Sequence, residues 1–233
     1  MRRLTIALAT ITQLAAVSAT AAPLAAQSAA PAGASPAVVA IGDSGPEAPA
    51  VEIAGFRSAQ FGATETEVRA AIAKDFHTDS GSIRAGTNPV ERTRVLAATA
   101  DNVLPDSGKA EVAYILGAKT KRLIQVNIVW HAANDQADMN RVVNDANVLR
   151  DYFVRKGSYA KGSLAANAKL PDGSVLVFRG ADAKGHLILL HLVLKAEQAK
   201  GAKPARVDGA TLILSYVEDP KAPDVFTLSP SAF

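Results

Sequence analysis

The sequence contains no cysteine among its 233 residues, and this absence excludes several kinds of chemistry at once. Disulfide bonds, thiolate metal sites, cysteine nucleophiles and the lipid-carrying cysteine of a lipoprotein are all ruled out. Aromatic residues make up only 5% of the chain, and no uninterrupted run of lysine and arginine exceeds two residues. The net charge of +3 therefore does not indicate nucleic-acid binding, which is typically signalled by basic clusters interleaved with aromatic residues.

Long hydrophobic segments are also scarce, and the apolar stretch near the N-terminus is shorter than the ~20 residues of a membrane span. Arg2 and Arg3 precede this stretch, which runs from Leu4 to Val17, and small residues follow it. The pattern is typical of a Sec-type signal peptide cleaved after Ala21 or, as a second choice, after Ala26. We therefore expect a periplasmic protein that is not a lipoprotein and keeps no stable transmembrane anchor after processing; an uncleaved N-terminal anchor is the alternative.

The segment Gln27–Ala50 has the composition of a disordered linker. It holds eight Ala, four Pro, three Gly and three Ser, with no Lys or Arg. Such a segment cannot bury enough apolar surface to offset the entropy that the chain would lose on folding. We expect the globular part to begin near Val51.

One motif inside this linker is similar to the nucleophile segments of trypsin-like serine proteases and of GDSL-type hydrolases. It is Gly42-Asp43-Ser44-Gly45. The former would need a histidine and an aspartate upstream, and the latter an Asp-x-x-His block, whereas Asp182 and His186 stand one residue too far apart. A short motif indicates catalysis only when its structural context fits, so we interpret Ser44 as part of the linker.

The remaining chain contains an internal duplication. Leu96–Gly108 and Leu164–Gly173 both carry Leu-Ala-Ala followed by Leu-Pro-Asp, and Leu123–Ala132 matches Leu187–Ala196 at an offset of 64. Matches in the same order at a nearly constant offset indicate two copies of one supersecondary unit. The predicted organisation is a signal peptide over 1–21, a linker over 27–50, a globular domain over 51–233 with repeats 51–133 and 134–218, and a tail over 219–233.

Each copy is predicted to open with a helix and continue with three strands. Thr64 with Glu67 has the spacing of a reciprocal capping box, and the apolar residues from Gln136 to Lys156 recur at helical spacing. Short loops between the strands require antiparallel pairing, so the predicted fold class is α+β: two tandem helix-βββ repeats that form an antiparallel sheet packed on two helices, plus a C-terminal strand. The predicted strands are Arg94–Thr99, Ala110–Leu116, Leu123–His131, Gly162–Ala168, Ser174–Arg179, His186–Lys195 and Thr211–Val217.

Alternation along the strands assigns their faces. On Leu123–His131, the even-numbered apolar residues should meet the helices, while Gln125, Asn127 and His131 point away from them. On His186–Lys195 the second face carries His191 among apolar residues, which is more apolar than contact with water favours. Either the loop near Glu197 or the tail after Asp219 covers this face, or it is a binding surface.

A duplicated unit of one helix on an antiparallel sheet, in an exported chain, resembles the β-lactamase inhibitory protein and the small outer-membrane assembly lipoproteins of the SmpA/OmlA type. The segment Gly55–Phe76 also resembles the opening of proteobacterial periplasmic proteins of unknown function, with the best agreement at Thr64 and Glu67. The resemblance implies a periplasmic or secreted protein-interaction module. It supplies no catalytic residues, and the chain lacks the lipid-bearing cysteine of the lipoprotein family.

No catalytic, cofactor-binding or metal-binding residues are predicted. His186 and His191 are five residues apart and project to opposite faces of a strand, so they cannot share a metal ion there. His131 and His191 form the one possible constellation, if they approach each other across the sheet. The acidic pairs near the helix starts, such as Asp135 with Asp138, are explained by the helix dipole.

The leading hypothesis is a non-enzymatic, exported interaction protein whose partner is another envelope protein. The candidate contact surface is the open sheet face with Gln125, Asn127, His131 and His191. The first alternative is a periplasmic module that binds a small ligand or lipid. The second is a cell-envelope hydrolase.

Overall fold

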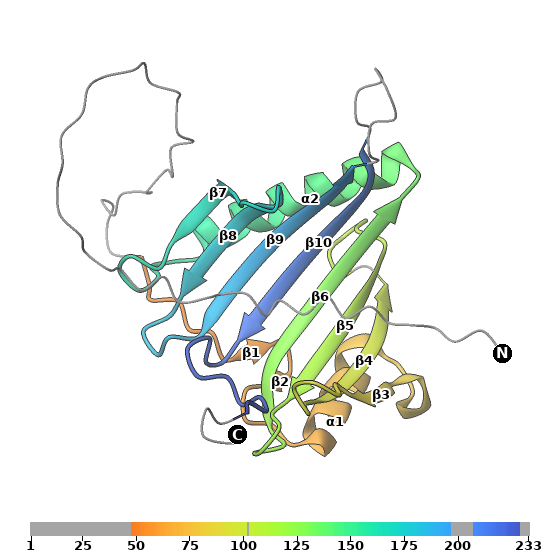
Figure 1. Cartoon of the computed structure of the whole chain (residues 1–233), viewed down its shortest axis with the longest axis vertical. Helices are drawn as coiled ribbons and strands as arrows, with labels where there is room; N and C mark the ends of the chain where they lie inside the picture. Colours follow the sequence, from red (N-terminus) through yellow and green to blue (C-terminus); the bar gives the residue numbers. More distant parts are fainter. Residues whose placement is uncertain (1–47, 102, 197–206, 229–233) are drawn as a thin grey trace. The chain divides into compact units, whose positions relative to one another are not determined.

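The computed structural model describes residues 48–101, 103–196 and 207–228, which belong to one compact unit of the chain. The predicted signal peptide and nearly all of the predicted linker, including Ser44, lie outside these described residues. The described part is a mixed α+β structure with a large antiparallel sheet, a small hairpin and two α-helices (Figure 1).

The large sheet has eight strands, and every neighbouring pair in it is antiparallel. This agrees with the pairing that the short loops between the strands require. The strands are β3 (Arg84–Thr87), β4 (Arg94–Asp101), β5 (Lys109–Leu116), β6 (Leu123–Ala133), β7 (Ala165–Lys169), β8 (Val175–Ala181), β9 (Leu187–Ala196) and β10 (Val207–Val217). Their order across the sheet is β3-β4-β5-β6-β10-β9-β8-β7.

The last strand of the chain occupies the middle of the sheet. β10 pairs with β6 on one side and with β9 on the other, so that Leu212 lies opposite both Trp130 and Leu192. The C-terminal strand predicted from the sequence is therefore the element that joins the first half of the sheet to the second.

The two helices, α1 (Glu65–Phe76) and α2 (Gln136–Arg155), begin where the sequence predicts them. Thr64 Oγ1 accepts from the Glu67 N–H at 3.3 Å, and the Glu67 carboxylate accepts from the Thr64 N–H at 2.7 Å, so the capping box is confirmed. Asp135 caps α2 with its carboxylate. Neither of these described helices is long and apolar enough to cross a membrane.

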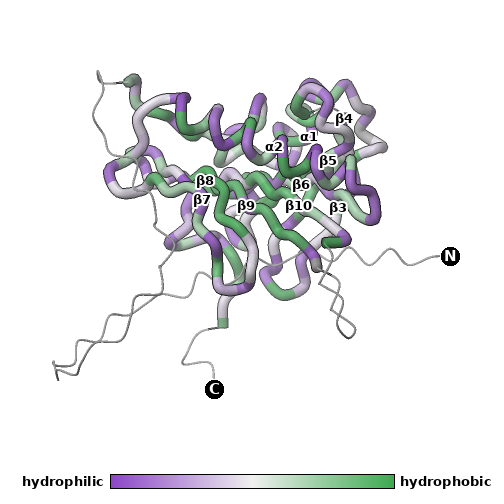
Figure 2. The backbone as a smooth tube through the Cα atoms, turned by 90° about the horizontal axis from the view of Figure 1, so that it is seen from above, coloured by the Kyte–Doolittle hydropathy of each residue, from purple (hydrophilic) through white to green (hydrophobic). Residues whose placement is uncertain are grey.

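Both helices lie on the same side of the sheet, and the residues between the layers form the core (Figure 2). On β6, Val126, Ile128 and Trp130 are at most 1% exposed, whereas Gln125 and Asn127 are half-buried. The predicted alternation along this strand is confirmed. The largest fully buried side chains are Trp130, Tyr114, Phe153, Phe178, Ile72, Leu96, Leu116, Leu123, Ile128, Ile188, Leu190 and Leu212.

The predicted tandem repeat is not confirmed. The strand order is symmetric about the β6–β10 pair, with one helix and four strands in each half. The sequence similarity at an offset of 64 aligns β6 with β9. In the sheet, however, the strand at the position equivalent to β6 is β10. The prediction also omitted β3, which adds a fourth strand to the first half.

The segment that precedes α1 runs along one end of the sheet. It carries the hairpin β1 (Gly55–Phe56) and β2 (Ala59–Gln60), which lies beside the ends of β6 and β10 (Figure 1). The Val51 N–H donates to the Ser158 carbonyl at 2.9 Å, and the Gly62 N–H donates to the Leu123 carbonyl at 2.8 Å. This segment therefore connects the second half of the sheet to the first.

Candidate functional site

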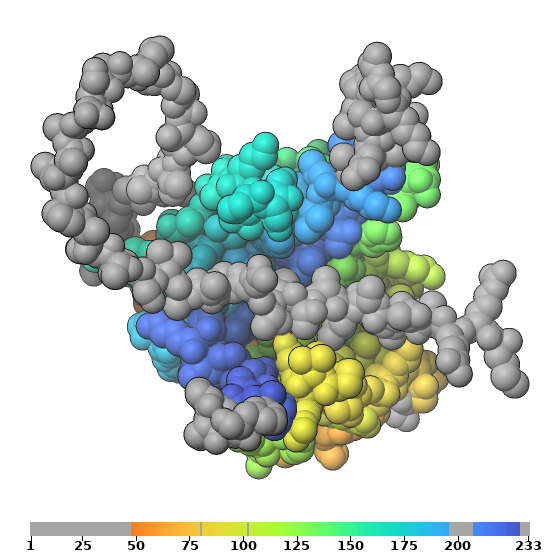
Figure 3. Space-filling view, in the orientation of Figure 1, coloured from red at the N-terminus to blue at the C-terminus, as the bar shows by residue number. Residues whose placement is uncertain are grey.

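The face of the sheet opposite the two helices is the first candidate, and we call it the open face because neither α1 nor α2 lies on it. Residues that pair across antiparallel strands project to the same side, so the register defines its members. Figure 3 looks onto this face and shows the blue side chains of the second half beside the green and yellow ones of the first. Its central part consists of Gln125, Asn127, Val129 and His131 on β6, Thr211, Ile213, Ser215 and Val217 on β10, and Leu189, His191 and Val193 on β9.

The register places all four predicted contact residues, Gln125, Asn127, His131 and His191, on the open face. The Gln125 amide donates to Asn127 Oδ1 at 2.8 Å, and His131 Nδ1 lies 2.9 Å from Thr211 Oγ1. Three of the four residues are on β6, but His191 is on β9, beyond β10. The four therefore flank the central strand and do not form a single cluster.

His131 and His191 share a face without approaching each other. β10 lies between their strands, which separates the two backbones by two strand spacings, about 9.6 Å. The constellation of these two imidazoles, which required their approach across the sheet, is therefore not formed. In the described part of the chain, no group of three or more His, Asp or Glu side chains is arranged to hold a metal ion.

His191 takes part in a different arrangement, with the turn that precedes β8. The Ser174 hydroxyl donates to Asp172 Oδ1 at 2.5 Å, and His191 Nε2 lies 2.7 Å from the same hydroxyl oxygen. Because that hydroxyl proton is already committed, Nε2 is the donor to Ser174, and Nδ1 of the neutral ring is an acceptor. Burial lowers the pKa of His191, with a smaller opposing effect from Asp172, so the ring is neutral at pH 7.

Apolar and unpartnered groups surround these polar residues. Val193 is 36% exposed, and Ser215, between Asn127 and Leu189 in the register, is buried with no hydrogen-bond partner for its hydroxyl. A buried hydroxyl without a partner costs about 1–3 kcal/mol of stability. This combination is suited to recognition by a mixed apolar and polar surface.

Of the two segments predicted to cover this face, one is described in part. The loop 197–206 lies outside the described residues. In the tail, the Phe226 N–H donates to the Glu91 carbonyl at 2.8 Å, and Asp224 accepts from Thr120 at 2.7 Å. Figure 3 shows this dark-blue tail beside the yellow residues of the first half. The described tail is therefore bonded to the first half of the sheet and not to the apolar residues of β9.

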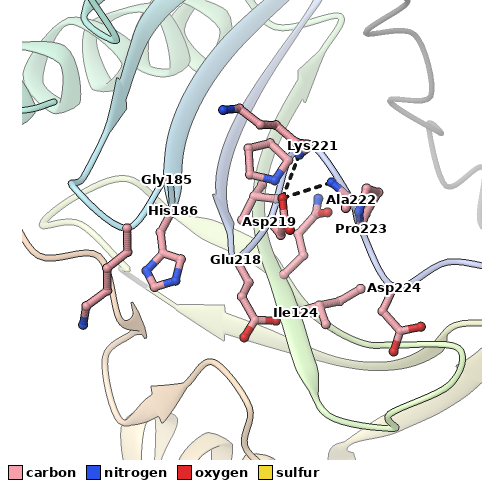
Figure 4. A pocket seen from close by; sticks show the side chains of 13 residues that line it. Ile124, Gly185, His186, Glu218, Asp219, Lys221, Ala222, Pro223 and Asp224 are labelled. Carbon is pink, nitrogen blue, oxygen red and sulfur yellow. Dashed lines mark hydrogen bonds between the residues drawn. The ribbon is translucent and has the colours of Figure 1, made fainter. Parts of the chain in front are cut away.

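A second candidate is a cavity of about 550 Å³ at the end of the sheet, which we call the end pocket (Figure 4). The ends of β6 and β10, the β8–β9 turn and the tail enclose it. It adjoins the open face, since Gln125 belongs to both. The residues that determine its chemistry are Lys184, His186, Glu218, Asp219, Lys221 and Asp224.

Asp182 orients the histidine of the end pocket. Asp182 is 3% exposed, and its carboxylate accepts from the N–H groups of Ile53, Lys184 and His186 at 2.9 to 3.0 Å. His186 Nδ1 lies 2.6 Å from the Ile53 carbonyl oxygen and 3.2 Å from Asp182 Oδ2. Both of these oxygens only accept, so Nδ1 carries the proton, and Nε2 of the neutral ring is left as an acceptor.

Glu218 lines the same pocket at the end of β10. Its N–H donates to the Ile124 carbonyl at 2.9 Å, which fixes the backbone, and its half-buried side chain points toward the cavity (Figure 4). Burial raises the pKa of the Glu218 carboxyl; a positive charge on His186 would oppose this effect, and the carboxylates of Asp219 and Asp224 add to it. A carboxylate with a raised pKa in a cleft is typical of ligand and catalytic sites, although structural networks produce such shifts too.

This pocket is not predicted from the sequence. Asp182 and His186 stand out there as a hydrolase motif with the wrong spacing, His186 also as a metal ligand that cannot share an ion with His191, and Glu218 does not stand out at all. The available signal was an aspartate and a histidine on either side of the tight turn Ala183-Lys184-Gly185. The described residues that line the pocket include no serine, threonine or cysteine.

Comparison of the chain with protein-family models, with curated proteins and with solved structures gave no match.

Proposed function

We propose that this chain is a non-enzymatic, exported binding protein of the periplasm, whose open face contacts another envelope protein. The observation that carries the proposal is the composition of the three central strands. Hydrogen-bonding groups of β6, at Gln125, Asn127 and His131, lie across β10 from apolar groups of β9, at Leu189 and Val193.

This arrangement favours a protein partner with apolar side chains beside hydrogen-bonding groups. Protein interfaces combine an apolar centre with about one hydrogen bond per 100–200 Å², whereas an acyl chain needs a continuous apolar lining. The resemblance to secreted inhibitory and assembly modules is consistent with the same use of a sheet.

A photoreactive residue at Asn127 tests the proposal in the periplasm, and the same residue at Asn140 is the matched control. Asn140 is an exposed position on α2, on the other side of the sheet. We expect a protein adduct at Asn127 that is absent at Asn140 and is lost when Val193→Asp places a charge on the apolar part of the face. The captured protein should then bind the purified chain, and this complex should also be lost in Val193→Asp.

Equal adducts at the two positions, or adducts that Val193→Asp leaves unchanged, would contradict the assignment of the open face. Recovery of lipid or small metabolites alone would favour the small-ligand alternative. The end pocket is the observation that supports this alternative, because its volume of about 550 Å³ lies within the ~300–1,000 Å³ range of small-molecule sites.

A further inference from the structure

We propose that the end pocket binds a positively charged hydrogen-bond donor, an ammonium or guanidinium group, which is held by the Glu218 carboxylate and Nε2 of His186. The inference does not depend on the partner proposed for the open face. It rests on which hydrogen-bonding groups in the pocket remain free once the internal contacts have been counted.

The first free group is the imidazole of His186. Its Nδ1–H is directed to the Ile53 carbonyl, and Asp182 lies on the same side of the ring. The edge-on contact with Phe61, at 5.2 Å between ring centres, holds the plane of the ring. Nε2 is therefore presented as a fixed acceptor that suits an N–H donor.

The second free group is the Glu218 carboxylate. No lysine or arginine forms an ion pair with it among the described residues. A half-buried carboxylate without such a partner is desolvated at a cost in stability, and a cation in the pocket would remove that cost. Glu218 therefore selects for positive charge.

The other two acidic groups of the pocket, Asp219 and Asp224, make hydrogen bonds within the protein. Asp219 Oδ1 accepts from the N–H groups of Lys221 and Ala222, and Asp224 accepts from Lys119 and Thr120 of the β5–β6 turn. These bonds hold the tail as one wall of the pocket.

The two lysines that line the pocket do not take the place of a ligand. Lys184 forms an ion pair of 2.8 Å with Glu52, and both side chains are more than 60% exposed. The ammonium of Lys221 lies at the opposite end of the pocket from the Glu218 carboxylate (Figure 4). The hydrogen-bonding groups that remain free near His186 and Glu218 are therefore acceptors.

The walls of the pocket suit the stem of such a ligand. Ile124, Val217, Pro220 and Pro223 line the cavity beside the polar groups. Methylene groups next to a charged head would contact these side chains, as the stems of lysine and arginine do elsewhere. The ligand is thus either a free aliphatic amine or the lysine or arginine side chain of a partner.

Calorimetric titration of the whole chain tests the site with defined probes. Spermidine represents a free amine, blocked lysine and arginine amides represent side chains, and blocked norleucine and glutamate amides are the neutral and anionic controls. We expect saturable binding of at least one cationic probe, and at least a tenfold loss of affinity in Glu218→Gln. Glu111→Gln, the same exchange on β5 outside the pocket, should leave the affinity unchanged.

A pH series on the unchanged chain gives a second, independent readout. The titratable groups that line the pocket together with Glu218 are Lys184 and His186 from the β8–β9 turn and Asp219, Lys221 and Asp224 from the tail. Acidification protonates the Glu218 carboxylate and removes its negative charge, so the affinity for the cation must fall as the pH is lowered. The part of this dependence that comes from the Glu218 carboxyl should be lost in Glu218→Gln.

Binding of spermidine alone would identify the ligand as a free amine, and binding of the side-chain probes alone would identify a partner's lysine or arginine. The proposal would be overturned if the norleucine or glutamate probe bound as well as the cations, if no cationic probe bound, or if Glu218→Gln left the affinity unchanged. None of these results bears on crosslinking at Asn127, so the two proposals fail separately.

Discussion

Exchanging Asp182 for asparagine should destabilise the protein by about 2–4 kcal/mol, because the exchange sets donors against donors in a buried site. The Asp182 carboxylate accepts from three backbone N–H groups, and its Oδ2 lies 3.2 Å from the protonated Nδ1 of His186. An asparagine whose oxygen accepts from the N–H groups of Lys184 and His186 turns its own NH₂ toward the Ile53 N–H and the imidazole. Each buried donor left without an acceptor costs about 1–3 kcal/mol.

Urea denaturation followed by tryptophan fluorescence would measure this loss, because Trp130 is the single tryptophan and is 1% exposed. The corresponding decrease in melting temperature is about 4–16 °C for a domain of this size. Asp172→Asn is the control: Asp172 is an exposed turn residue, and the asparagine oxygen can still accept from Ser174, so the loss should be much smaller than in Asp182→Asn. A loss in Asp182→Asn no larger than in this control would refute the reasoning, as would unchanged hydrogen exchange at the Ile53 amide.

Three further outcomes are expected. Glu218→Gln should stabilise the chain at pH 7. The folded-state pKa of Glu218 is raised, so the carboxyl stabilises the fold in its protonated form, below the ordinary pKa of glutamate, and this contribution is lost as the pH rises. The gain should stay under about 1 kcal/mol and vanish below about pH 4, and denaturation at both pH values would test this. Leu212→Ala should cost about 3 kcal/mol in urea denaturation because Leu212 is fully buried in the central strand, whereas Val193→Ala at the surface should cost less than about 1 kcal/mol. Thr64→Ala should cost about 1 kcal/mol through loss of the cap of α1, and Thr64→Ser should restore most of it; an equal loss in both would contradict the capping explanation.

Elements with local signals could be predicted from the sequence. The capping box at Thr64 and the glycine that follows α2, Gly157, lie within a few residues of the helix ends that they determine. The strand β6 alternates strictly between buried and half-buried side chains along most of its length, which is a pattern of neighbours in the sequence. For such elements the energetic cause and the sequence signal are the same few residues.

The arrangement of strands had no comparable signal. β10 enters between β6 and β9, and its pairing with Trp130 joins residues that are 82 positions apart, Trp130 and Leu212. The short strand β3 contains Gly86 and exposed side chains, so neither hydrophobicity nor strand propensity marks it. The similarity of β6 to β9 reflects an apolar strand pattern that both share, and it gave the alignment at an offset of 64 without giving their places in the sheet.

The same distinction separates the two candidate sites. Gln125 and Asn127 could be assigned to the open face because alternation along one strand is sufficient to place them there. The end pocket exists only after three distant segments meet: the start of β6, the turn with His186, and the end of β10 with Glu218 and the tail that follows it, which Asp224 ties to the β5–β6 turn. None of these residues is unusual in its own segment. Their chemistry depends on the position of the tail, because the tail forms one wall of the cavity. In this cavity Glu218 lies beside an oriented imidazole and has no ion-pair partner.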